Sequence, residues 1–577
     1  MYLFHLFRSF LPLHNPIGFG AGDFVEIAVA ALLVALILCR AAIEPAAFRL
    51  ARHTGWSMLF LGGLAAGLRL ALLPHFPAPT PAGADDFSYL LLSDTLAHFR
   101  LANPVHPLHE FFETNFVLQT PSYSSIYPLG PALALAAGQL VFGSPWAGVL
   151  VSAAAVCAFI YWMLRAWTTP GWSFAGGLLA VGAFGPLSYW MNTYWGGAVS
   201  AIAGCLVFGS LPRLKNAGRA RDAFLLGVGL GLQMLSRPYE SLFLDAAVAA
   251  FLAPGLLSPE RRRSLTRLAL PAIAAFLPAA GLILLHNHAV TGSWTDLPYM
   301  LSRYRYGVPT TFTFQPNPKP HGDLAPNQWL YYQGQAAAHG DAPETVATYV
   351  HRLGSRIPFY RFFVFPPLVL ALAAFLPAVR RARFAWLAAT VVLFMLGSNF
   401  YPYFFPHYLA ACACLFLAAE MAGLARLSRW TVRGLSVGTE AAAFLLLLCG
   451  AHFLFWYSLH AIGDSDVLQA MYRRQSWDAI PPDDPEGRAA INSTLAAQPG
   501  KQLVFVRYWP RHGYHEWIHN AADIDRAPVV WAQDLGDRND ELTHYFRDRT
   551  AWLLEPDARP PRLGPYHAHT VEFEEVR

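Results

Sequence analysis

Charged side chains are scarce in this chain, since Asp, Glu, Lys and Arg make up 14% of its 577 residues while hydrophobic residues make up 55%. So little charge, with the apolar residues gathered in long blocks separated by basic gaps, excludes an ordinary soluble protein and predicts a polytopic membrane protein. The chain also lacks a glycine-rich phosphate loop, a dinucleotide fingerprint and an internal repeat. A soluble nucleotide cofactor therefore has no obvious binding segment.

A signal-peptide cleavage site is missing and cysteine is scarce. Residues 1–18 lack the small-residue cleavage site of a secretory signal, and we expect them to form an interfacial amphipathic stretch. Cysteine is rare, with six residues that all fall in predicted spans. Structural disulfides are therefore not expected. Cys412 and Cys414 are expected to serve helix packing, because residues i and i+2 do not face each other on a helix.

Long apolar runs are the dominant positive feature. They predict an all-α membrane region of about 12 transmembrane helices over residues 1–459, with outer loops at 74–128 and 286–360. The predicted spans are 24–39, 57–73, 146–167, 172–190, 198–211, 223–236, 242–257, 268–285, 362–378, 384–398, 408–424 and 441–457.

Four basic segments set the predicted orientation. Residues 213–221, 261–267, 380–383 and 426–433 are rich in Lys and Arg and are separated by even numbers of spans. Because short basic loops stay in the cytoplasm, all four are expected on that side, which places the polar, aromatic and proline-rich segments on the outer face. If the apolar run at 129–141 were counted as a span, Asp85 and Asp86 would lie inside or Arg165 would lie outside, so we expect this run to be re-entrant or interfacial.

The acidic pair Asp85 and Asp86 lies just beyond the span 57–73, on the predicted outer face. Residues 87–99 are expected to form a short helix that keeps Tyr89 close to the lipid. A partly desolvated carboxylate at a membrane boundary is a candidate general base. The alternative is an ordinary polar loop after a span, in which acids are common.

Arginines in other outer segments are candidate phosphate ligands. Arg237 lies at the mouth between two spans, and a buried arginine there must be paired or bind an anion. A lipid phosphate is one such anion, whereas pairing with Glu240 is the alternative. Arg303 and Arg305 alternate with tyrosines in a pattern that suits bidentate phosphate binding with aromatic stacking, or headgroup anchoring.

Two patterns suggest metal. His106, His109, Glu110 and Glu113 can share one face of a short helix, although their spacing matches no strict ligand pattern and favours a solvated interfacial helix. His515, Glu516 and His519 match the H-E-x-x-H pattern of zinc peptidases. No third ligand follows at helical spacing, and the motif helix would have to fit between closely spaced strands.

The composition changes to a polar tail from about residue 460. Strand-like runs at 503–506, 529–531, 552–554 and 570–573 alternate with helical patterns, among which 534–547 is a predicted covering helix. We therefore predict a soluble α/β domain over 460–577, on the periplasmic side of a bacterial membrane.

Residues 77–130, with their acid pair, following helix and Tyr-Pro-rich end, resemble the first outer loop of C-type membrane glycosyltransferases (GT-C). The similarity is closest to bacterial members of glycosyltransferase family 39 and to lipopolysaccharide galacturonosyltransferase-like proteins. It extends to 189–197, 236–240, 406–408 and 515–535. In those proteins the second acid is usually Glu, so this chain departs at Asp86, and Asp85 is the better-matched catalytic base.

The resemblance implies an inverting transfer of sugar from a polyprenyl-phosphate donor to a hydroxyl acceptor at the periplasmic face of the bacterial inner membrane. Asp85 and Asp86 would be catalytic, and Arg237, Arg303 and Arg305 would bind the donor phosphate. No cofactor is certain and a divalent metal stays open; the partners are the bilayer, the donor and an unnamed acceptor, with no nucleic acid. The residues expected to line the substrate groove are Tyr89, Tyr127, Tyr194, Trp195, Tyr239, Glu240, His407 and Tyr408.

Two other classes remain open. A membrane-bound zinc hydrolase would use His515, Glu516 and His519, and would carry stoichiometric zinc. A non-catalytic lipid carrier or polymer-export component would use the same aromatic, arginine-lined surfaces and would tolerate loss of Asp85.

Overall fold

The computed structural model describes residues 21–463, 480, 484, 487–510, 512 and 515–567. The chain divides into two compact units, each built from separated segments. The helical unit comprises Met1–Pro79, Trp146–Gly281 and Glu344–Pro481, and the mixed unit comprises Thr80–Pro145, Leu282–Pro343 and Pro482–Arg577. The mixed unit thus groups most of the two predicted outer loops with the C-terminal region, whereas the sequence analysis assigned them to different domains. Residues 1–18 and the predicted strand at 570–573 lie outside the described residues.

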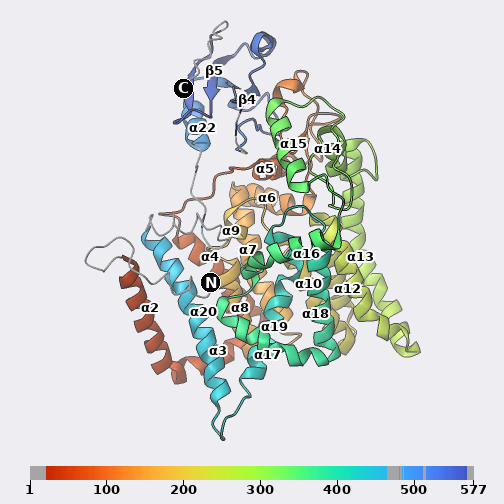
Figure 1. The fold of residues 1–577 in the computed structure, drawn as a ribbon, viewed down its shortest axis with the longest axis vertical. Helices are drawn as coiled ribbons and strands as arrows, with labels where there is room; N and C mark the ends of the chain where they lie inside the picture. Colours follow the sequence, from red (N-terminus) through yellow and green to blue (C-terminus); the bar gives the residue numbers. More distant parts are fainter. Residues whose placement is uncertain are drawn as a thin grey trace. The chain divides into compact units, whose positions relative to one another are not determined.

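Helices make up the described secondary structure of the helical unit (Figure 1). Several begin at a proline, which suits the first helical position because its missing N–H has no intrahelical partner there. The helices are α2 (Ala21–Leu38), α3 (Arg40–Arg52), α4 (Thr54–Ala71), α7 (Pro145–Leu164), α8 (Pro170–Phe184), α9 (Tyr189–Asn192), α10 (Ala198–Ala217), α11 (Ala220–Ser236), α12 (Pro238–Leu256), most of α13 (Pro259–Thr291), α16 (Val346–Ser355), η2 (Ile357–Phe363), η3 (Pro366–Leu368), α17 (Val369–Phe375), η4 (Leu376–Arg380), α18 (Ala382–Ser398), η5 (Pro406–Cys412), α19 (Ala413–Leu427) and α20 (Val437–Ile462).

The predicted fold class is confirmed, because the protein is a mostly helical, multi-span membrane protein with a mixed α/β sheet near its C-terminus. Within the described residues, six helices are long and apolar enough to cross a bilayer, or up to eight if each bent pair is one span. This replaces the count of about 12. Several predicted spans are shorter helices in the structure: α8 ends at Phe184, before Gly185 and Pro186, although the predicted span ran to residue 190.

Small residues allow the helices of this unit to pack closely. A Cβ atom placed on Gly204 of α10 would lie 1.9 Å from the carbonyl oxygen of Ala411, and one on Gly423 of α19 would lie 1.9 Å from that of Ala371. Such backbone contact is typical of transmembrane helix interfaces, where packing replaces the hydrophobic effect as the driving force. These glycines therefore set the distance between helices.

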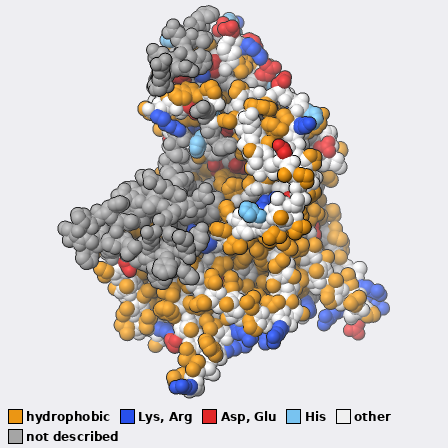
Figure 2. Space-filling model, in the orientation of Figure 1, with side chains coloured by type: hydrophobic (Ala, Val, Ile, Leu, Met, Phe, Trp, Pro, Cys, Tyr) orange, Lys and Arg blue, Asp and Glu red, His pale blue; other side chains and the backbone are white. Residues whose placement is uncertain are grey.

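Basic side chains gather at one end of the helical unit. Figure 2 shows an otherwise largely hydrophobic surface with Lys and Arg along its lower edge. Figure 1 places the start of α13 and the α19–α20 connection at that end. Two of the four basic segments therefore share one end of the helical unit. They are 261–267 and 426–433, which were predicted to lie on the same side of the membrane.

The mixed unit packs short helices around a small sheet. Its strand order is β4-β3-β5-β6, with β3 parallel to both β4 and β5 and with β6 antiparallel to β5. The elements are α5 (Ala84–Ala97), η1 (His109–Phe112), β1 (Val117–Leu118), β2 (Ser124–Ser125), α6 (Leu129–Phe142), α14 (Pro298–Tyr306), α15 (Pro326–His339), α22 (Arg488–Ala496), β3 (Lys501–Val506), β4 (Val529–Gln533), η6 (Gly536–Arg538), α23 (Asn539–Tyr545), β5 (Arg549–Glu555) and β6 (Arg562–Pro565).

Three predicted strands, at 503–506, 529–531 and 552–554, are confirmed as parts of β3, β4 and β5. The predicted covering helix at 534–547 is shorter than expected, because η6 forms a separate 3₁₀ turn before α23. The apolar run at 129–141 forms the 14-residue helix α6, which packs against α5.

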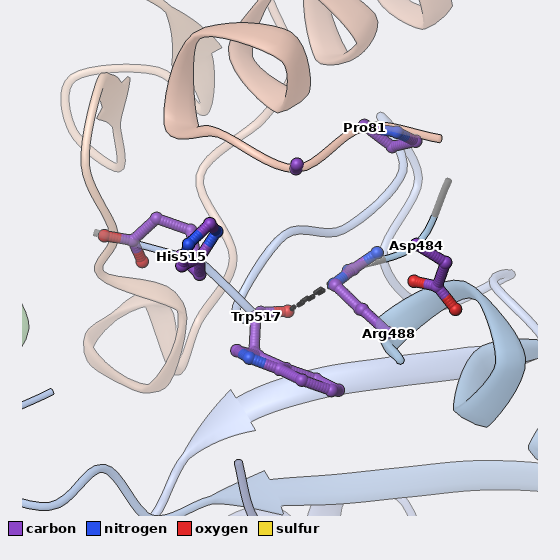
Figure 3. A pocket seen from close by; sticks show the side chains of 7 residues that line it. Pro81, Asp484, Arg488, His515 and Trp517 are labelled. Carbon is purple, nitrogen blue, oxygen red and sulfur yellow. Dashed lines mark hydrogen bonds between the residues drawn. The ribbon is translucent and has the colours of Figure 1, made fainter. Parts of the chain in front are cut away.

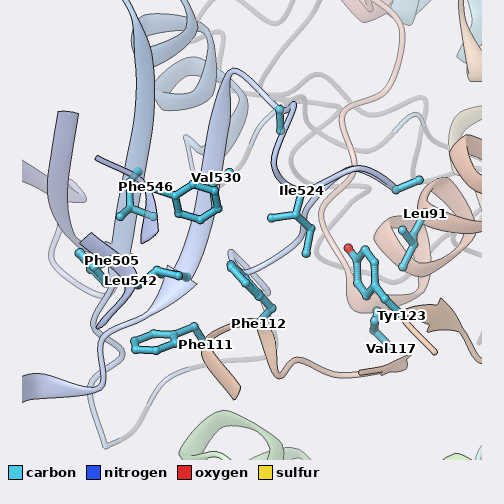
Figure 4. Packing of buried hydrophobic residues seen from close by; sticks show 14 residues of the cluster. Leu91, Phe111, Phe112, Val117, Tyr123, Phe505, Ile524, Val530, Leu542 and Phe546 are labelled. Carbon is cyan, nitrogen blue, oxygen red and sulfur yellow. The ribbon is translucent and has the colours of Figure 1, made fainter. Parts of the chain in front are cut away.

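Both faces of the sheet are buried, which explains its continuous apolar strands. On one face, Leu503 and Phe505 of β3 pack in one cluster with Leu91 of α5 and with Phe111 and Phe112 of η1 (Figure 4). The alternate residues of β3 pack on the other face with Leu495 of α22, Trp517 and Ile518. The segment that follows the acidic pair is therefore part of the core of the C-terminal sheet.

Candidate functional site

The acidic pair lies in the first turn of α5. This helix begins at Ala84, three residues earlier than predicted, so both acids are helical. One Asp86 carboxylate oxygen accepts hydrogen bonds from the backbone N–H groups of Gly83, at 3.3 Å, and Ala82, at 3.4 Å. Such a contact satisfies N–H groups that the helix itself leaves without a partner. Asp86 is buried and caps the helix, so its carboxylate has a structural role.

Asp85 is the half-buried member of the pair. Its Oδ1 accepts a hydrogen bond from the hydroxyl of Tyr127, whose ring stacks on that of Tyr89 at 4.4 Å. Burial, aided by the charge of Asp85, raises the pKa of Tyr127 well above its usual value, so the phenol stays a neutral donor. The positive end of the helix dipole favours negative charge in this turn. The arrangement holds one oriented carboxylate with access to solvent.

A C-terminal segment runs along α5 from its beginning toward its end. His515 forms a β-bridge with Gly83, the His519 ring stacks on Phe87 at 4.4 Å, and the Asp94 carboxylate accepts a hydrogen bond from the N–H of Ala522 at 2.7 Å. The segment 515–522 therefore fixes the helix that carries the acidic pair.

The H-E-x-x-H match is not a zinc helix. Residues 515–519 form no helix, and the Glu516 carboxylate accepts hydrogen bonds from Thr114 (3.2 Å), Asn115 and Asn327 (3.2 Å). Burial raises the pKa of Glu516, while these donors stabilise its charge and lower the pKa. Nowhere in the described chain do three or more His, Cys, Asp or Glu residues stand close enough to hold a metal.

The second metal candidate is dispersed as well. Only His109–Phe112 is helical there, as the 3₁₀ turn η1. His106 contacts Asp525 at 3.2 Å, Glu110 forms an ion pair with Arg538, and Glu113 accepts from Gln328 at 3.1 Å. These described residues neither share a metal site nor form a solvated helix. Instead, their contacts attach the loop to the rest of the mixed unit.

The two arginines of α14 have different surroundings. Arg303 donates to the carbonyls of Pro309 at 3.1 Å and Thr310 at 3.2 Å, so it holds the chain that follows α14. Arg305 donates to the hydroxyl of Thr120 and places its charge near Glu113. Within the described residues, Arg305 makes fewer side-chain hydrogen bonds than Arg303, which leaves more of its guanidinium for an anion.

Glu113 is a titrating group of the mixed unit. Burial raises its pKa from 4.5 to about 7, although hydrogen bonds from Gln328 and Tyr306 partly oppose this. The folded state holds the Glu113 proton more tightly than the unfolded state does. Protonation of Glu113 therefore stabilises the folded protein fully below pH 4.5, and this stabilisation is lost as the pH rises to about 7; the pKa shift corresponds to about 3 kcal/mol.

We expect Glu113→Gln to flatten the dependence of stability on pH, measured as thermal midpoints of the detergent-purified protein. Glu110→Gln, in the same loop, is the control and should keep the wild-type slope.

The remaining predicted site residues lie in the helical unit. The Arg237 guanidinium is 3.7 Å from the Glu240 carboxylate and lies over the Tyr408 ring at 5.0 Å. The pairing of Arg237 with Glu240 that the sequence left as an alternative is thus present. Glu240 is buried, and the Tyr239 hydroxyl donates to the carbonyl of Gly397 at 3.1 Å.

Aromatic side chains surround this arginine. The His407 N–H donates to the Tyr189 hydroxyl at 3.0 Å, and the Trp195 ring lies 5.2 Å from that of His407. Tyr194 donates to the carbonyl of Pro79 at 2.9 Å. The structure therefore brings Arg237, Glu240, Tyr408 and His407 into one cluster of the helical unit, and Asp85, Tyr89 and Tyr127 into one cluster of the mixed unit.

Comparison with protein-family profiles and with curated proteins finds no match for this chain. Among solved structures, ArnT from Cupriavidus metallidurans in the apo state is 12% identical, with a TM-score of 0.48, over 87% of this chain and 93% of that one. The same protein bound to undecaprenyl phosphate is 11% identical, with a TM-score of 0.46 and the same coverage.

The oligosaccharyltransferase of Archaeoglobus fulgidus, in a complex with zinc and sulfate, is 12% identical with a TM-score of 0.43, over 86% of this chain and 67% of that one. With identities of 12% or lower and TM-scores below 0.5, these likenesses carry no argument about the activity of this chain.

Proposed function

We propose that this protein is an inverting glycosyltransferase that moves a sugar from a polyprenyl-phosphate donor to a hydroxyl acceptor. The observation that carries the proposal is Asp85, a half-buried carboxylate in the first turn of α5 that a half-buried, neutral tyrosine orients. A base of this kind is what an acceptor hydroxyl needs, because an alcohol is a weak nucleophile until its proton is removed.

In the proposed reaction, Asp85 takes the proton of the acceptor hydroxyl as its oxygen bonds to the anomeric carbon. The bond from that carbon to the phosphate oxygen breaks at the opposite face, which inverts the configuration, and the polyprenyl phosphate leaves with the electron pair. Tyr127 keeps the carboxylate oriented through its hydrogen bond.

The leaving phosphate requires a cation, because its developing charge must be stabilised in the transition state. We assign this role to Arg305 in preference to Arg303, whose donors already bind backbone carbonyls. Arg237 is proposed to bind lipid phosphate at the helical unit, where Glu240 and Tyr408 orient it. We further propose that the acidic pair and the mixed unit face the periplasm of a bacterial inner membrane.

Among the described residues, no three His, Cys, Asp or Glu side chains stand close enough to form a metal site by themselves. The steps proposed above use protein side chains alone, and the chelator in the following test decides whether a metal takes part.

The test is transfer of radiolabelled sugar by the detergent-purified chain from a panel of polyprenyl-phosphate donors to a membrane extract, with and without a chelator. We expect chelator-insensitive transfer from at least one donor. Loss of transfer with chelator would contradict the metal-free reaction. If no donor is turned over while the chain binds polyprenyl phosphate and Asp85→Asn complements a deletion strain, the carrier alternative holds instead.

A further inference from the structure

A small pocket of the mixed unit lies beside the start of α5 (Figure 3). The chain just before the acidic pair forms one wall, and residues from the C-terminal region form the others. The lining residues are Pro81, Ala82, Asp484, Arg488, His515, Glu516 and Trp517. Figure 3 shows the guanidinium end of Arg488 directed toward the loop of Pro81, with the His515 ring on the other side of the opening.

Arg488 brings a positive charge whose partners are neutral. Its Nε and Nη2 donate to the carbonyl of Trp517, at 3.2 and 3.1 Å, and Nη2 also donates to that of His519 at 3.2 Å. The guanidinium lies over the rings of Phe87, at 4.3 Å, and Trp531, at 4.9 Å. Within the described part of the chain, Nη1 makes no hydrogen bond. Burial lowers the pKa of Arg488 to about 10, which still leaves it charged at neutral pH.

The two carboxylates of the pocket are engaged elsewhere. Asp484 accepts hydrogen bonds from the N–H groups of Ala489 and Ala490, each at 2.8 Å, and so caps α22. Glu516 accepts from the side chains described above. The field of Asp484 reaches Arg488, yet no described carboxylate is within ion-pair distance of the guanidinium. A half-buried cation without a paired anion favours binding of an oxyanion.

The position of the pocket connects it to the acidic pair. Ala82 lines the pocket, its N–H caps Asp86, and Gly83 pairs with His515. A group bound to Arg488 therefore lies next to the turn that carries Asp85. The cavity has room for about one water-sized group, so it is too small for a sugar ring and admits one oxygen of an anionic group at its opening.

We propose that Arg488 and His515 bind an oxyanion of the acceptor, either a phosphate monoester or a carboxylate, and thereby place a neighbouring hydroxyl near Asp85. This substrate assignment rests on the proposed transferase function. It makes the C-terminal region part of acceptor recognition, and it predicts that neutral acceptors react more slowly than anionic ones.

The experiment is titration calorimetry of the detergent-purified full chain with glycerol phosphate, glucuronate and neutral glycerol. We expect one of the two anions to bind and glycerol not to bind; the anion that binds identifies the acceptor group. Arg488→Gln should weaken binding about 10-fold or more, the effect of losing a charge-assisted hydrogen bond. His515→Gln should weaken it as well, and it leaves the Arg488 contacts to the backbone in place. Arg538→Gln is the matched control, because Arg538 pairs with Glu110 and Glu541 at the exposed surface.

The proposal would be overturned if each anion bound the Arg488→Gln and His515→Gln variants as tightly as it binds the wild type. Equal rates of transfer to anionic and neutral acceptors would also overturn it, and that result would leave the transferase itself intact. If the wild type transfers no sugar but still binds an anion in an Arg488-dependent way, the transferase proposal fails while the anion site stands.

Discussion

Replacing Asp85 by asparagine should slow sugar transfer by about 10²- to 10⁴-fold, which is the usual contribution of a positioned general base. Asparagine keeps the shape of the side chain and an oxygen that accepts from Tyr127, but it does not take up the acceptor's proton. Donor binding should stay close to that of the wild type. The measurement is single-turnover transfer alongside binding of the donor, and a variant that transfers at the wild-type rate would contradict the role of Asp85.

Asp86→Asn provides the matched comparison, because it alters the neighbouring carboxylate. We expect it to lower thermal stability by about 1 kcal/mol, since Asp86 caps α5. Transfer should fall far less than with Asp85→Asn. If Asp86→Asn instead abolished transfer in a fully folded protein, the roles of the two acids would be reversed.

Much of the fold could be predicted from the sequence, because a bilayer imposes long apolar helices whatever their later packing. The number of helices long enough to span a bilayer could not be predicted from the sequence. An apolar run such as 172–190 does not reveal that its helix ends at Phe184, where Gly185 and Pro186 turn the chain. Strands β3, β4 and β5 were predictable since each is a short apolar run between polar segments.

Asp85 was a candidate from the sequence because it lies just beyond a hydrophobic run, at a predicted membrane boundary where a carboxylate is partly desolvated. The role of Asp86 was also within reach, since Gly83 and Asp86 have the spacing of an N-cap residue and its N3 partner. Arg488 was missed because nothing in its local sequence marks it; its pocket is formed by residues brought together from distant parts of the mixed unit.

The H-E-x-x-H motif shows why a short pattern misleads without its structure. The partners of Glu516 include Thr114 and Asn327, which lie 402 and 189 residues away in the sequence. No local spacing encodes such a network. A zinc motif requires a helix that places both histidines on one face, and residues 515–519 do not form one.

Replacing Glu516 by alanine should destabilise the mixed unit by about 3–5 kcal/mol, because it leaves the buried donors of Thr114, Asn115 and Asn327 without an acceptor. Since the segment 515–522 runs along α5, the loss should also loosen the helix that carries the acidic pair. The measurement is hydrogen exchange of α5 and of 515–522, together with thermal unfolding of the full chain.

Glu541→Ala, at an exposed ion pair of the same unit, is the control and should change stability little. The zinc-hydrolase alternative makes the opposite prediction, in which purified protein carries stoichiometric zinc that is lost in His515→Ala while α5 exchanges as in the wild type. Faster exchange of α5 in Glu516→Ala, with no zinc in the wild type, would establish the segment as a structural support for the acidic pair. Bound zinc with unchanged exchange would make it a metal site and would leave the positioning of Asp85 to Tyr127 and the helix cap.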